Sequence, residues 1–155
     1  MLFEKKIVLL TGAYGGIGKS IAELLINKGA KVILSGRDEA KLQNLADQLN
    51  NKASFIKCDL SDFSSVSNLV NKSSELYGEE INVLINNAGL TMDGLAVRMS
   101  KDDWQMPIDV NLTSAFLLSK SALKPMMRQK WGRIINISSI VGVMGNGGQS
   151  NYAAS

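Results

Sequence analysis

A glycine-rich segment near the start of the sequence has the residue types and spacing of a phosphate-binding loop. The apolar run Ile7–Thr11 is followed by Gly12, Gly16 and Gly18, after which a helical pattern begins. In a dinucleotide-binding loop, the first glycine permits a tight turn, the second lets the backbone approach a pyrophosphate, and the third lets helix and strand pack closely. The N-terminus of the helix then faces the phosphates. This segment predicts binding of a dinucleotide.

The same segment fits, less completely, the phosphate loop of nucleotide-hydrolysing enzymes. Gly18-Lys19-Ser20 would end a Gly-x-x-x-x-Gly-Lys-Ser/Thr pattern, but Ala13 stands where its first glycine belongs. Such an enzyme also needs an acidic residue at a strand end to help hold Mg²⁺, and Asp59 is the nearest candidate. A lysine in the first turn of a helix is more often simply solvated, so we prefer the dinucleotide interpretation.

The end of the second apolar run bears on which dinucleotide binds. Its sequence is Leu34-Ser35-Gly36-Arg37-Asp38. An acidic residue about 20 positions after the glycines usually holds the ribose of NAD, whereas a nearby arginine accommodates the additional phosphate of NADP. Gly36 has no side chain, Arg37 can bind a phosphate through two parallel hydrogen bonds, and Asp38 is better explained as a helix N-cap. The sequence therefore predicts NADP(H), with a plain surface charge as the alternative role of Arg37.

The overall composition is that of an ordinary globular domain. The 155 residues are 45% hydrophobic and 20% charged, and the net charge of +3 is too small to indicate a nucleic-acid binder. The absence of histidine excludes Ser-His-Asp hydrolysis and histidine metal ligation, and no metal site is predicted. Cys58 is the only cysteine, which favours a reducing compartment such as the cytoplasm. Residues 1–10 lack the apolar core of a signal peptide, and no apolar run approaches the roughly 18 residues that cross a membrane.

Short β-rich runs alternate with longer helical patterns along the chain. The expected strands are Ile7–Thr11, Val32–Ser35, Ser54–Cys58, Val83–Asn86 and Ile134–Ser138, and the expected helices lie near Ile17–Lys28, Glu39–Asn50, Phe63–Tyr77 and Leu112–Lys130. Asp38 and Asp62 precede helices and are expected to be N-caps. Alternating strands and helices predict an α/β fold, with a single Rossmann-like domain over residues 1–155. The strands should form a doubly wound parallel sheet in the order 3-2-1-4-5.

Two segments near the end of the sequence resemble the active-site region of the short-chain dehydrogenase/reductase family. They are Arg133-Ile-Ile-Asn-Ile-Ser-Ser139 and Gln149-Ser-Asn-Tyr-Ala-Ala-Ser155. The resemblance implies that Tyr152 donates a proton to the alkoxide formed when a ketone is reduced, and that Ser139 hydrogen-bonds the substrate carbonyl. Ser138 is the neighbouring alternative, but the interval to the tyrosine fits Ser139 better. Gln149 is implied to contact the substrate.

Asn111 resembles the family asparagine that orients a proton-relay water, and the alternative is an amide that caps or stabilises a helix kink. The family also has a lysine four positions after its tyrosine, which lowers the pKa of the phenol. The sequence given ends at Ser155, one position earlier, and the family's remaining strands and helices would follow it. A carboxylate at that place would raise the pKa of Tyr152. We therefore expect this chain to be C-terminally incomplete, marginally stable and nearly inactive, with its fifth strand at an open sheet edge.

Further strand ends carry motifs that the family uses to hold its cofactor. Asp59-Leu60 follows the third expected strand, where the family's acidic residue hydrogen-bonds adenine, and Asn86-Asn87-Ala88-Gly89 ends the fourth, where the amides brace the sheet. Ligands bind at the carboxyl ends of strands in open α/β sheets. The residues implied to bind NADP(H) are Gly12, Tyr14, Gly15, Gly16, Ile17, Gly18, Arg37, Asp59, Leu60, Asn86, Ala88 and Gly89.

Several stretches are similar to the bacterial 3-oxoacyl-[acyl-carrier-protein] reductases within that family. They are residues 93–99, 103–104, 109–112 and 143–152. This similarity implies NADPH-dependent reduction of a 3-oxoacyl group on acyl carrier protein to the 3-hydroxyacyl form in fatty acid biosynthesis, by a homotetramer. Lys130 matches a basic residue used for carrier docking, and Lys124, Arg128 and Arg133 are near it in sequence.

The chain departs from the family pattern at two positions. Pro107 replaces an apolar residue and is expected to bend a helix start, and Gly15 replaces a residue that is often basic in the glycine loop.

Two alternative functions remain open. One is another NADP-dependent short-chain alcohol or ketone reductase, and the other is a non-catalytic nucleotide-binding fragment.

Overall fold

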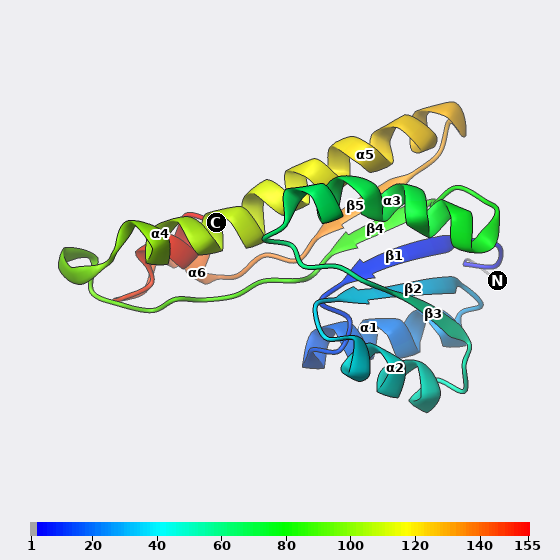
Figure 1. Ribbon diagram of the computed structural model, residues 1–155, viewed down its shortest axis with the longest axis horizontal. Coiled ribbons are helices and arrows are strands. Elements are labelled where there is room, and N and C mark those ends of the chain that lie inside the picture. Colours follow the sequence, from blue (N-terminus) through cyan, green and yellow to red (C-terminus); the bar gives the residue numbers. More distant parts are fainter. Residues whose placement is uncertain (1–2) are drawn as a thin grey trace.

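The computed structural model describes residues 3–155, so Met1 and Leu2 of the N-terminal segment lie outside it. Five parallel strands form one sheet in the order β3-β2-β1-β4-β5, as predicted (Figure 1). The strands are β1 Ile7–Thr11, β2 Lys31–Gly36, β3 Ala53–Lys57, β4 Val83–Asn86 and β5 Arg133–Asn136. Each predicted strand is therefore confirmed, with its ends displaced by at most two residues.

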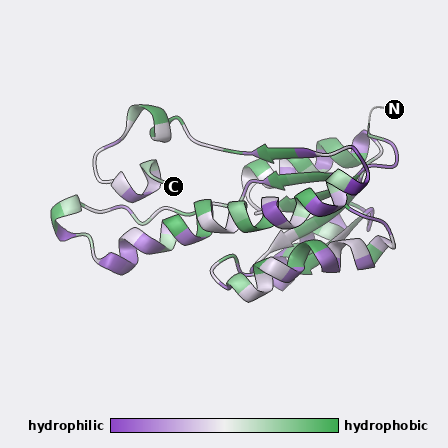
Figure 2. Ribbon diagram, turned by 90° about the horizontal axis from the view of Figure 1, so that it is seen from above, coloured by the Kyte–Doolittle hydropathy of each residue, from purple (hydrophilic) through white to green (hydrophobic). Residues whose placement is uncertain are grey.

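Helices cover both faces of the sheet, because parallel strands are joined by helical crossovers. One face carries α1 Gly16–Asn27 and α2 Glu39–Gln48, and the other carries α3 Phe63–Tyr77 and α5 Ser114–Arg128 (Figure 1). Green predominates on the central parts of the strands in Figure 2, while polar and apolar residues alternate along the helices. This arrangement is the doubly wound α/β fold that the sequence predicts.

The central strand β1 shows how the sheet divides the core in two. Val8 and Leu10 pack into the apolar cluster beneath α1 and α2, whereas Ile7 and Leu9 pack into the cluster beneath α3 and α5. Successive side chains of a strand point to opposite faces, so a strand covered on both faces needs a continuous apolar run. All five residues of β1 are buried.

The two predicted N-caps are confirmed. A carboxylate oxygen of Asp38 accepts a hydrogen bond from the backbone N–H of Lys41, and one of Asp62 accepts from that of Ser64. The Lys41 N–H lowers the pKa of Asp38, and the Ser64 side chain contributes most to lowering the pKa of Asp62. These caps fix where α2 and α3 begin, directly after the carboxyl ends of β2 and β3.

The helix predicted near Leu112–Lys130 is confirmed as α5, and further helical structure precedes it. Helix α4 (Lys101–Pro107) leads into a π-helical segment (Ile108–Thr113), which leads into α5 without a break. The helical structure before Leu112 was not predicted, because a proline disfavours a helix interior. Pro107 is the last residue of α4, directly before the π-helical segment. The short helix α6 (Val141–Met144) was not predicted, since four residues are too few to show helical periodicity. Helix α7 (Ser150–Ala153) contains Tyr152, where the family resemblance implies that a helix begins.

Strand β5 is the outermost strand on its side of the sheet, as predicted. Ile135 of this strand is 44% exposed. The chain then runs beyond the sheet to α6 and α7, of which α7 packs against α4 and α6 packs against α7 (Figure 1). Across residues 3–155, the structure contains no helix that combines the length and apolar character needed to cross a bilayer.

Candidate functional site

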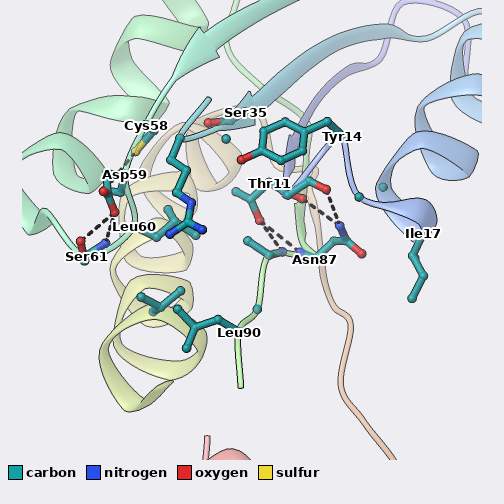
Figure 3. A pocket seen from close by; sticks show the side chains of 18 of the residues that line it. Thr11, Tyr14, Ile17, Ser35, Cys58, Asp59, Leu60, Ser61, Asn87 and Leu90 are labelled. Atoms are coloured by element: carbon teal, nitrogen blue, oxygen red, sulfur yellow. Dashed lines mark hydrogen bonds between the residues drawn. The ribbon is translucent and has the colours of Figure 1, made fainter. Parts of the chain in front are cut away.

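A cleft of about 480 Å³ opens at the carboxyl ends of the strands (Figure 3). Its walls come from the loop after β1, the ends of β2 and β3, the segment after β4, and the helical region before α5. Every residue predicted to bind the cofactor lines this cleft except Asn86. Met106 and Val110 also line it, and they were not predicted because they belong to the helical region that sequence patterns missed.

The three glycines of the loop differ in whether the surrounding structure leaves room for a side chain. Gly12 has a φ angle of +61°, and a Cβ atom there would lie 2.8 Å from Cα of Ala88. A Cβ atom on Gly18 would lie 2.9 Å from Cα of Ala13 and still closer to the carbonyl oxygen of Gly12. Around Gly16, by contrast, no atom lies within 4 Å of such a Cβ atom. The fold therefore requires the first and third glycines, while the second leaves space open in the cleft.

The loop fits the pyrophosphate of a dinucleotide. Helix α1 begins at Gly16, and its N-cap, Gly15, has no side chain to satisfy the first N–H groups of the helix. Those N–H groups have no partner within the helix, and the helix dipole favours an anion beside them. The first turn of α1 has no acidic residue to compete for this place. The open space at Gly16 is thus a suitable position for phosphate oxygens.

The alternative phosphate-loop interpretation gains no support from the side chains it needs. The amine of Lys19 points to α2, where it donates a hydrogen bond of 2.8 Å to Oε1 of Gln48. The hydroxyl of Ser20 donates to the carbonyl oxygen of Gly16, one turn earlier in the same helix. Both groups are therefore turned away from the phosphates that they would hold in a nucleotide-hydrolysing enzyme.

Thr11 and Asn87 join the two strand ends at the centre of the cleft (Figure 3). The hydroxyl oxygen of Thr11 accepts hydrogen bonds of 3.1 Å from the backbone N–H groups of Asn87 and Ala88. The side-chain amide of Asn87 donates in return to the carbonyl oxygens of Thr11 and Gly12. These bonds hold the glycine loop against the segment after β4. Sequence reasoning anticipated that the amides brace the sheet but did not identify Thr11 as their partner.

Asn86 lies just outside the cleft and braces the sheet. Its side-chain amide donates a hydrogen bond of 2.8 Å to Oδ1 of Asn136, which joins β4 to β5. It also lies 3.4 Å from the hydroxyl of Ser119 on α5. The structure therefore supports a bracing role for Asn86, and the predicted contact with a cofactor stays a prediction.

The far side of the cleft is formed by the loop after β3 (Figure 3). The carboxylate of Asp59 accepts hydrogen bonds from the backbone N–H and the hydroxyl of Ser61, and these lower the pKa of Asp59. At the base of the cleft, the hydroxyl of Ser35 is buried and has no hydrogen-bond partner among residues 3–155. A buried group of this kind costs stability unless a ligand or water satisfies it. The cleft thus offers a fixed acceptor and an unused hydroxyl.

The residues predicted to act on the substrate lie on the segment after β5. Ser139 precedes α6, and its hydroxyl oxygen accepts a hydrogen bond from the N–H of Val141. Tyr152 belongs to α7, which packs against α6, so the fold brings the two predicted segments together. The side-chain amide of Gln149 donates a hydrogen bond of 3.0 Å to Asp93. None of these three predicted residues lines the cleft described above.

Asn111 connects the cleft with the helix that carries Tyr152. In the π-helical segment, its side chain exchanges hydrogen bonds of 2.9 and 3.0 Å with the backbone of Leu90, a residue of the cleft wall. Its amide also donates to the hydroxyl oxygen of Ser155, whose own hydroxyl donates to the carbonyl oxygen of Tyr152. Asn111 therefore stabilises the irregular helix and links the two parts of the site.

Asn151 was not predicted, although it fixes the position of α7. It is fully buried, and its amide donates to the carbonyl oxygens of Met92 and Asp103 over 2.8 and 2.7 Å. Asp103 is four residues before Pro107, which has no N–H to give to that carbonyl. Asn151 thus supplies the hydrogen bond that the proline removes. An asparagine beside the predicted tyrosine was the only signal in the sequence.

The basic group predicted to dock a carrier lies at the amino ends of the strands, opposite the cleft. Lys130 follows α5, and Arg133 begins β5, so both are at the amino end of that strand, whereas the cleft is at the carboxyl ends. Arg128 forms an ion pair with Glu80. The group is therefore separated from the cleft by the length of the sheet, and its role in docking stays a prediction.

Comparison with known proteins agrees with this architecture. The sequence pattern of the short chain dehydrogenase family matches residues 6–155. The chain is 44% identical to the 3-oxoacyl-[acyl-carrier-protein] reductase FabG of Salmonella typhimurium and 45% identical to that of Escherichia coli K12, over 99% of this chain and 63% of each relative. It is 47% identical to FabG of Rickettsia prowazekii, over 97% of this chain and 60% of the relative. The chain thus spans about three fifths of the length of these relatives. On this evidence, the chain belongs to the short chain dehydrogenase family.

Proposed function

We propose that this chain is the dinucleotide-binding part of an NADPH-dependent 3-oxoacyl-[acyl-carrier-protein] reductase of fatty acid biosynthesis, and that it carries the general acid of the reaction. One observation carries the proposal. The glycine loop, Arg37, Asp59-Leu60 and Ala88-Gly89 line a single cleft at the carboxyl ends of the strands. The name borne by relatives that are 44–47% identical supports the choice of substrate.

The preference for NADP(H) over NAD(H) rests on the end of β2. Gly36 offers no carboxylate to the ribose hydroxyls, and Arg37 lines the same wall of the cleft. A guanidinium binds a phosphate more strongly than a neutral group does. We therefore assign the additional phosphate of NADP(H) to the neighbourhood of Arg37.

The residues of the chain provide the proton and position the substrate. NADPH, when bound, supplies a hydride to the carbonyl carbon. The phenol of Tyr152 gives its proton to the carbonyl oxygen, and the hydroxyl of Ser139 hydrogen-bonds that oxygen before and after the transfer. Asn111 holds the carbonyl oxygen of Tyr152 through Ser155, so it orients the helix from which the phenol projects. Gln149, held by Asp93, is assigned to the substrate side.

Several wider features belong to the same proposal. The substrate is a 3-oxoacyl thioester of acyl carrier protein, which is an acidic protein that would dock on the basic group containing Lys130. The enzyme would be a cytoplasmic homotetramer.

The test is NADPH oxidation by the protein that carries this chain, with acetoacetyl-acyl carrier protein and with simple ketones as substrates. Tyr152→Phe should lower turnover at least about 100-fold by removing the proton donor, while the affinity for NADPH, measured by fluorescence titration, stays the same. Faster reduction of simple ketones would favour a general ketone reductase. Binding of NADPH without any turnover would favour a non-catalytic protein, and no binding would refute the proposal.

A further inference from the structure

Tyr14 lies directly against Gly36 at the end of β2. A Cβ atom on Gly36 would stand 2.5 Å from Cε1 of the Tyr14 ring and 3.3 Å from its Cζ atom, much closer than the 3.5–4.0 Å or so at which carbon atoms normally pack. The ring therefore fills the space into which a side chain at position 36 would project. Tyr14 is held there because it also packs against the apolar cluster beneath α1 and α2.

This contact bears on which dinucleotide the cleft accepts. An acidic side chain near the end of the second strand usually holds the ribose hydroxyls of NAD. The Tyr14 ring occupies the place of such a side chain at Gly36. A carboxylate at position 36 would therefore clash with a residue of the glycine loop, so that any selection against NAD at this place would be steric as well as electrostatic.

Tyr14 lines both the cleft and a second hollow of about 470 Å³ between α1 and α2. In this hollow, Nζ of Lys41 lies 5.6 Å from the centre of the Tyr14 ring and 3.6 Å from a carboxylate oxygen of Asp38. The side chains of Lys41 and Asp38 are 65% and 40% exposed. An exposed ion pair of this kind contributes little stability, so Lys41 can exchange Asp38 for an anion of higher charge.

We propose that Tyr14 and Lys41, together with Arg37, form a corner that binds a phosphate monoester on the adenosine ribose, and that Tyr14 determines the selectivity for NADP over NAD. Arg37 lines the cleft, Lys41 lines the hollow, and Tyr14 lines both. Gly15 has no side chain, so this position of the glycine loop supplies no positive charge to the phosphate. Lys41 supplies that charge instead. The inference rests on the proposed function, since it requires an adenine dinucleotide in the cleft.

The role of Lys41 is tested with two ligands that differ by one phosphate, 2′,5′-ADP and 5′-AMP, by calorimetric titration of the protein that carries this chain. Lys41→Met keeps the length of the side chain and removes its charge. It should lower the affinity for 2′,5′-ADP about five- to tenfold and the affinity for 5′-AMP less than about twofold. Lys72→Met, at an exposed position on α3, is the matched control and should change neither affinity. Asp38→Asn keeps an N-cap but removes the competing charge, so it should tighten 2′,5′-ADP.

The steric role of Tyr14 is tested by a double-mutant cycle with NADH and NADPH. Gly36→Asp alone should lower the melting temperature and gain little affinity for NADH, because the ring and the carboxylate need the same space. In the Tyr14→Ala background, the same change should be tolerated and should favour NADH. Fluorescence titration gives the affinities, and thermal unfolding shows whether each variant is folded.

Three results would overturn these assignments. If Lys41→Met lowered the affinities for 2′,5′-ADP and 5′-AMP equally, or lowered neither, Lys41 would be excluded from the phosphate corner. An effect of Gly36→Asp that is the same with and without Tyr14 would exclude the steric role. If the unaltered protein that carries this chain bound neither nucleotide, the proposed function would fail together with this inference, so the two kinds of failure are distinguishable.

Discussion

The side-chain amide of Asn151 donates a hydrogen bond to the backbone carbonyl of Asp103, the carbonyl that loses its helical partner to Pro107. Asn151→Ala leaves this carbonyl and that of Met92 without the amide, and we expect a loss of about 1–3 kcal/mol in the free energy of unfolding. Denaturant unfolding measures the loss. Asn146→Ala, at an exposed position in the same segment, should cost less than about 0.5 kcal/mol. Similar losses in the two variants would show that Asn151 is not a special anchor.

Pro107→Ala tests the same relationship from the other side. Removing a proline from a helix interior normally stabilises it, because the missing hydrogen bond is restored. Here the new N–H of residue 107 would compete with Asn151 for the carbonyl oxygen of Asp103. We therefore expect faster hydrogen exchange in residues 150–155, even though α4 itself becomes more protected. Unchanged exchange in residues 150–155 would contradict the coupling.

Gly18 and Gly16 form a matched pair for the glycine loop. Gly18→Ala places a methyl group against the backbone of Gly12 and Ala13, and we expect a loss of about 1–3 kcal/mol of stability from the forced shift. Gly16→Ala meets no atom within 4 Å, so the fold should keep its stability. Its methyl group would instead occupy the place assigned to phosphate oxygens and lower the affinity for NADPH. A stable Gly18→Ala variant, or a Gly16→Ala variant with unchanged affinity, would be evidence against this division of roles.

Thr11→Val removes the hydroxyl that accepts from two backbone N–H groups but keeps the shape of the side chain. We expect it to cost about 1–3 kcal/mol, because the N–H groups of Asn87 and Ala88 lose their acceptor. Thr11→Ser retains the hydroxyl and is the control for the loss of a methyl group. Chemical unfolding of the three proteins measures their stabilities. Equal stability of the valine variant and the parent would show that the Thr11 hydroxyl does not stabilise the fold through these two hydrogen bonds.

Local patterns predicted the parts of this molecule whose causes are local. The apolar run of β1 follows from burial on both sides, the Asp38 cap from hydrogen bonding over three residues, and the glycine loop from a turn with a positive φ angle. Contacts between distant residues had no such signal. Thr11 meets Asn87 across 76 positions, and Asn151 meets Asp103 across 48. Tyr14 against Gly36 belongs to the same class, since a tyrosine in a loop does not reveal which backbone it covers.

Cys58 provides a prediction of pH dependence. The thiol is buried, and burial raises its pKa above 9.0. The native state thus holds this proton more tightly than the unfolded state, so its contribution to stability is complete below pH 9.0 and is lost as the pH rises through the higher native pKa. The thiol should also react with a disulfide reagent more slowly than a free cysteine, and NADPH should slow it further because Cys58 lines the cleft. A reaction as fast as that of free cysteine would contradict the burial.

The π-helical segment Ile108–Thr113 sets a limit on how the gene can change in length here. Successive residues of an α-helix are related by a rotation of about 100°. One codon gained or lost within the segment would therefore turn everything on one side of it away from its neighbours. Asn111 would then leave Leu90, or Leu118 would leave the core of the sheet. Natural variants of this stretch should accordingly differ by replacement of residues and keep their number.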